Sequence, residues 1–138
     1  MRIAAFFACT EVKLYEDRYP DVINAGMSLI EVTAYPAVIP FTFFYILIRD
    51  AVDKSEKQRL TLRTFLDEEE VDSNPVEVDF RDDMAIYPQV CKVGARIHAD
   101  GRYRFELHTS GKEPWKWPVR IRRKNPQANT QEIFPPSS

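Results

Sequence analysis

Residues 41–48 read Phe-Thr-Phe-Phe-Tyr-Ile-Leu-Ile and are apolar at seven of eight positions. Aromatic and β-branched residues favour a strand over a helix. Because both alternating sets of positions are apolar, we expect a central strand that is covered on both faces. The wider apolar segment, residues 34–48, is shorter than the roughly 20 residues of a membrane-spanning helix, and Pro36 and Pro40 interrupt it.

The segments around this stretch repeat the two-residue period of a β-strand. Prolines and short polar clusters separate them at intervals of roughly 10–15 residues. The predicted strands cover residues 3–9, 27–32, 41–48, 59–66, 75–80, 91–97, 103–109 and 115–122. We therefore predict an all-β fold, an antiparallel β-sandwich of about seven to nine strands with an immunoglobulin-like or C2-like arrangement. A partly open barrel is the alternative.

The predicted strands 91–97 and 103–109 are expected to form a hairpin. A three-residue loop, residues 99–101, aligns their apolar faces, whereas a two-residue turn mixes apolar and polar faces. The expected loop is a type I turn followed by a bulge, with Gly101 in the left-handed conformation. Pro118 indicates that the strand over residues 115–122 lies at a sheet edge, because proline donates no hydrogen bond to a ladder.

Length and composition favour one domain. The chain has 138 residues, 44% of them hydrophobic, which suffices for a sizeable core. We expect residues 1–124 to form the sandwich and the Pro- and Ser-rich residues 125–138 to form a mobile tail. Cys9 and Cys91 are expected to face the core as reduced thiols, with a single bridge as the alternative. The apolar N-terminal run ends without a cleavage site, so a cytoplasmic location is expected.

The formal net charge of −2 combines two opposite halves. Residues 1–88 hold 17 acidic and 9 basic side chains, whereas residues 89–138 hold 4 acidic and 10 basic ones. Basic side chains at outward positions of the C-terminal strands suit carboxylates or phosphates. The predicted partner-binding face comprises Arg96, His98, Arg102, Arg104, Lys116, Arg120 and Arg122.

This basic face predicts a non-enzymatic binding or scaffolding module that engages an acidic partner surface. The expected partner is another protein or a second copy of the chain. Nucleic acid is a less favoured partner, and no membrane association is expected. The competing interpretation is an ordinary solvated sheet face.

Acidic loops give a second functional interpretation, a sandwich that binds a small ligand or a cation. Carboxylates are the ligands that Ca²⁺ prefers, although no D-x-D-x-D-G loop is present. The weak metal candidates are Asp67, Glu69, Asp79, Asp82 and Asp83. No catalytic residue and no cofactor is predicted, since His98 and His108 have no evident nucleophile beside them. An enzyme with a cleft hidden from the sequence is the third alternative.

Several segments resemble a family of small uncharacterised bacterial proteins classed only as a domain of unknown function. They are residues 4–12 (Ala-Ala-Phe-Phe-Ala-Cys-Thr-Glu-Val), 24–30, 36–40 and 41–48. Residues 101–107 (Gly-Arg-Tyr-Arg-Phe-Glu-Leu) are similar to the closing hairpin of many β-sandwich modules. The resemblance covers about half the chain and implies a compact β-sandwich. It implies no activity and transfers no functional residue.

Overall fold

The computed structural model describes residues 1–49, 57–79 and 85–124, and ten β-strands form within them. The strands are β1 (Arg2–Cys9), β2 (Glu11–Lys13), β3 (Asp21–Ile23), β4 (Leu29–Val32), β5 (Ala37–Ile48), β6 (Lys57–Leu66), β7 (Glu69–Asp79), β8 (Ile86–Ile97), β9 (Gly101–His108) and β10 (Trp115–Arg123). The described segments contain no helix, so none there could cross a membrane. The predicted tail, residues 125–138, lies outside the described residues.

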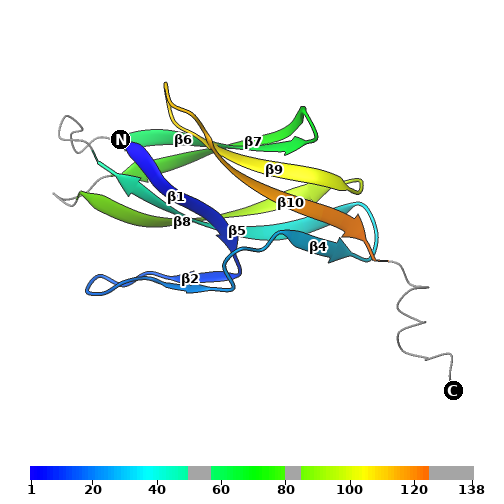
Figure 1. The fold of residues 1–138 in the computed structure, drawn as a ribbon, viewed down its shortest axis with the longest axis horizontal. Coiled ribbons are helices and arrows are strands. Elements are labelled where there is room, and N and C mark those ends of the chain that lie inside the picture. The colour runs from blue at the N-terminus through cyan, green and yellow to red at the C-terminus, as the bar shows by residue number, and fades with distance from the viewer. Residues whose placement is uncertain (50–56, 80–84, 125–138) are drawn as a thin grey trace, which may run out of the picture.

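Two facing sheets form the predicted sandwich (Figure 1). One sheet has three strands in the order β1-β5-β8, and the other has five in the order β4-β10-β9-β6-β7. All neighbours run antiparallel except β4 and β10, which are parallel. The short hairpin β2–β3 was not predicted, and it lies on the far side of the three-stranded sheet from the five-stranded one (Figure 1). The all-β sandwich is therefore confirmed.

The core lies between the two sheets and is built around aromatic side chains of β5 and β9. The ring of Phe105 lies 4.6 Å from that of Phe41 and 4.9 Å from that of Phe43, so these three rings join the sheets. The predicted central strand is confirmed, because β5 lies between β1 and β8. Its outward-facing Phe44 is only 4% exposed and packs against Phe7. Burial on both faces explains why both alternating sets of positions in this stretch are mainly apolar.

The predicted hairpin between residues 91–97 and 103–109 is wrong. β8 pairs with β5 in one sheet, whereas β9 pairs with β10 and β6 in the other. The connection between them therefore crosses the sandwich. Gly101 does not take the left-handed conformation, which occurs at Gly26 and Gly111 instead. A Cβ atom at Gly101 would collide with the side chain of Leu66, so close packing accounts for this glycine.

The two cysteines lie on opposite faces of the three-stranded sheet. Cys9 pairs with Thr42 and Cys91 with Phe43, which are successive residues of β5 and face opposite ways. Cys9 is buried as predicted, at 1% exposed, but it faces away from the five-stranded sheet, whereas the half-buried Cys91 faces the core between the sheets. Both thiols are free, and burial raises the pKa of each. Protonated, largely buried thiols on opposite faces form neither a bridge nor a nucleophile.

Candidate anion-binding site

The seven predicted basic residues lie on two separate surfaces. Five occupy the outer face of the five-stranded sheet, namely Arg102, Arg104, Lys116, Arg120 and Arg122. Arg96 belongs to β8 in the other sheet, and His98 follows that strand. These two side chains line a separate hollow of about 340 Å³, together with Val71, Asp72 and Gly94. A single continuous basic face is therefore not formed, because β8 and β9 belong to different sheets.

Two hydrogen bonds and one contact with an aromatic ring fix the position of the Arg104 side chain on the sheet. Its Nε donates a hydrogen bond to Oε2 of Glu106 at 2.5 Å, and its Nη1 donates to the carbonyl of Asp67 at 3.3 Å. The guanidinium also lies over the ring of Phe65, 4.7 Å from the ring centre. Through these contacts, Arg104 takes part in the packing of β9 against β6.

Glu106 is the buried centre of this part of the face. It is 5% exposed, and its Oε1 lies 2.8 Å from Nε2 of His108. The neighbouring strands place Arg63 and Lys116 directly opposite it in register. Desolvation raises the pKa of Glu106, but the hydrogen bonds from Arg104 and His108 outweigh it, so the pKa is lowered overall. A charged carboxylate thus offsets the surrounding basic groups.

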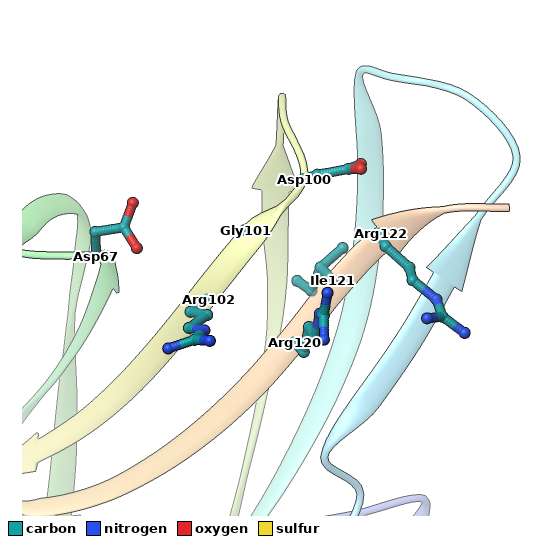
Figure 2. Close-up of a pocket in the computed structure, with 7 residues that line it drawn as sticks. All are labelled: Asp67, Asp100, Gly101, Arg102, Arg120, Ile121 and Arg122. Atoms are coloured by element: carbon teal, nitrogen blue, oxygen red, sulfur yellow. The ribbon is translucent and has the colours of Figure 1, made fainter.

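Arg122 also has an acidic partner. Its Nε lies 3.5 Å from Oε2 of Glu31 on β4, and the parallel register places these two residues side by side. Figure 2 shows the Arg122 side chain directed toward β4 and away from Arg102. Its charge is therefore partly offset, although it still borders the neighbouring hollow.

Arg102 and Arg120 differ from these residues because neither guanidinium forms an ion pair or hydrogen bond with the described part of the chain. They are directly opposite each other on β9 and β10 (Figure 2). Like charges at such positions destabilise a sheet. The arrangement costs stability, and an anion bound between the two groups would offset that cost.

A hollow of about 360 Å³ opens beside this pair (Figure 2). It is lined by Asp67, Asp100, Gly101, Arg102, Arg120, Ile121 and Arg122. Asp100 is already engaged, since it accepts hydrogen bonds from the Tyr35 hydroxyl and from the backbone N–H of Arg123. These two bonds lower the pKa of Asp100. The carboxylate thus fixes the start of β9, and its charge acts on Arg120 only at a distance, without an ion pair or hydrogen bond between them.

Asp67 shapes the other wall of the hollow through its backbone. It lies in the turn between β6 and β7 with a φ of 54°, a conformation that aspartate tolerates better than most residues. Its N–H donates to the carbonyl of Arg102 at 3.1 Å. The turn is thereby held against the start of β9, beside the unpaired guanidinium groups.

The weak metal candidates are not brought together. Asp67 and Glu69 lie at one end of β7 and Asp79 at the other, while Asp82 and Asp83 fall outside the described residues. Within residues 1–49, 57–79 and 85–124, no group of three potential ligands could hold a metal ion.

His108 and Glu106 supply a base and a group that orients it, as in hydrolase triads. Thr61 lies opposite His108 in register, but no hydrogen bond joins its hydroxyl to the ring. The described residues therefore place no activated nucleophile beside this pair.

Comparisons with known proteins add no functional assignment. No family model, curated protein or solved structure matches the chain. The resemblance to uncharacterised bacterial proteins thus stays a prediction.

Proposed function

We propose that the protein is a non-enzymatic binding module whose Arg102–Arg120 pair engages an acidic group on a partner protein. The observation that carries this proposal is that Arg102 and Arg120 pair directly in register on adjacent strands and form no ion pair or hydrogen bond with the described residues. Guanidinium groups bind carboxylates in a two-pronged geometry, and adjacent strands hold both groups on a rigid support. Lys116 and Arg122 on the same face extend the positive field that attracts an acidic surface. Two reduced thiols favour the cytoplasm as the compartment of this encounter.

A titration with a fluorescent decaglutamate peptide tests the proposal. The double variant Arg102→Glu/Arg120→Glu is expected to weaken binding at least about tenfold at low salt, because it reverses both charges at the site. Affinity of the wild-type protein is expected to fall as salt rises.

The matched control is Arg2→Glu/Lys13→Glu, which makes the same change in net charge at exposed positions of β1 and β2. We expect this control to bind nearly as the wild type does. Equal loss in both double variants would mean that net charge alone governs binding, and it would overturn the proposal. Unchanged binding by Arg102→Glu/Arg120→Glu would overturn it as well.

A further inference from the structure

A second hollow borders the Arg102–Arg120 pair on the side away from Asp67 and Asp100. Its volume is about 290 Å³, and it is lined by Ser28, Arg102, Tyr103, Pro118, Val119 and Arg120. It contains no acidic side chain, and its walls are almost entirely apolar. The apolar surface comes from the Pro118 ring, from the strands at Tyr103 and Val119, and from the aliphatic stems of the arginines. The charged pair thus has an apolar neighbour.

Pro118 lines this hollow at a part of β10 that β4 does not pair with. β10 lies between β4 and β9, so the prediction of an edge strand is wrong over Arg120–Arg123. The pairing with β4 begins only at Arg120, and therefore Pro118 lies beyond the last residue of that ladder. Because proline has no backbone N–H, this position cannot donate a hydrogen bond to an additional strand.

The spacing of the two features matches the repeat of an extended chain. Arg120 and Pro118 are two residues apart on β10, so they lie on one face, about 6.8 Å apart along the strand. A partner segment in extended conformation presents its own side chains on one face at the same interval. When such a segment lies along β10, an acidic side chain at the arginine pair places the side chain two positions away beside Pro118.

We infer that the site recognises an extended protein segment in which an acidic and an apolar side chain are two residues apart. This inference rests on the proposed function, because the acidic side chain is the group bound by Arg102 and Arg120. The apolar side chain enters the hollow beside Pro118 and removes its surface from water. Recognition would thus depend on the spacing of the two side chains as well as on charge.

Two peptides of identical composition test the spacing. Acetyl-Thr-Glu-Thr-Leu-Thr-amide has its acidic and apolar side chains on one face, whereas acetyl-Thr-Glu-Leu-Thr-Thr-amide has them on opposite faces. Chemical shifts of the ¹⁵N-labelled protein would be followed during titration to millimolar concentration. We expect the first peptide to bind about fivefold more tightly, the effect of half burying a leucine side chain.

Variants of the protein separate this inference from the proposed function. Pro118→Ser is expected to abolish the preference between the peptides while retaining binding, and Pro40→Ser, at an exposed proline of β5, to leave the preference intact. Equal binding of both peptides to the wild type, with loss in Arg102→Glu/Arg120→Glu, would overturn the spacing inference alone. Equal affinity of the wild type and that double variant for the first peptide would overturn both proposals, as would no binding by either peptide.

Discussion

Two groups of basic side chains on one sheet face differ in their acidic neighbours. Around the buried Glu106, the groups of Arg104 and His108 bond to one carboxylate. Farther along β9 and β10, Arg102 and Arg120 form no ion pair or hydrogen bond with a carboxylate of the described residues, although Asp67 and Asp100 line the same hollow. The first group therefore stabilises the fold, and the second remains available to a ligand. The number of basic residues on a face does not measure its capacity to bind an anion.

Among the changes that test this comparison, replacing Glu106 with glutamine should have the largest effect on the free energy of unfolding. Glu106→Gln keeps the shape of the side chain but leaves the groups of Arg104 and His108 without their carboxylate. We expect the free energy of unfolding to fall by about 3 kcal/mol, measured by urea denaturation at neutral pH. The exposed Glu113→Gln should change it by less than about 0.5 kcal/mol. A loss below about 1 kcal/mol in Glu106→Gln would mean that solvent, and not Glu106, balances these charges.

Lowering the pH should reduce the contribution of the charged Glu106 to the stability of the fold. The pKa of Glu106 is lower in the folded protein than in the unfolded chain, so its stabilisation is complete above the unfolded value of about 4.3. It is lost as the pH falls through the lowered, folded pKa. The stability difference between the wild type and Glu106→Gln should therefore shrink between about pH 4 and pH 2. A difference that stays constant over this range would contradict the central role of the charged carboxylate.

A pair of threonine substitutions would give the smallest effects, and these should have opposite signs. Arg120→Thr removes a like-charge pair and introduces a residue that favours strands, so stability should rise by about 0.5 kcal/mol. Arg104→Thr removes the hydrogen bond to Glu106 and the contact with Phe65, so stability should fall by about 1 kcal/mol. Thermal unfolding of both variants would measure the contrast. A loss of stability in Arg120→Thr would show that Arg120 contributes to the fold.

The alternation of apolar residues was sufficient to predict the strands but not their partners. Leu60, Leu62 and Phe105 face the core as their period requires. The same period in residues 91–97 and 103–109 fits a hairpin within one sheet and also a crossing between two sheets. Pairings distant in sequence define the crossing, because β8 pairs with β5 and β9 pairs with β6. No local pattern contains that information.

The candidate site was predicted only in part, because the sequence pattern indicates which face a residue lies on but not which strands are neighbours. Arg102, Arg120 and Arg122 were expected on one face. The pairing of β9 with β10 brings Arg102 and Arg120 together, whereas Arg122 forms an ion pair with Glu31 on β4. Arg96 was assigned to that face through the incorrect hairpin. Glu106 interrupts the basic set in the sequence, and its burial between neighbouring strands could not be inferred without knowing those strands.

The pairing of β9 with β10 also bears on when the site can exist. Arg102 and Arg120 become neighbours only after the last described strand has joined the five-stranded sheet. During synthesis, a chain that ends before β10 contains Arg102 but lacks its counterpart, and it also lacks the buried Val119 and Ile121. Affinity for the acidic partner would therefore arise together with completion of the core. A ribosome-bound or truncated chain would not compete with the finished protein for that partner.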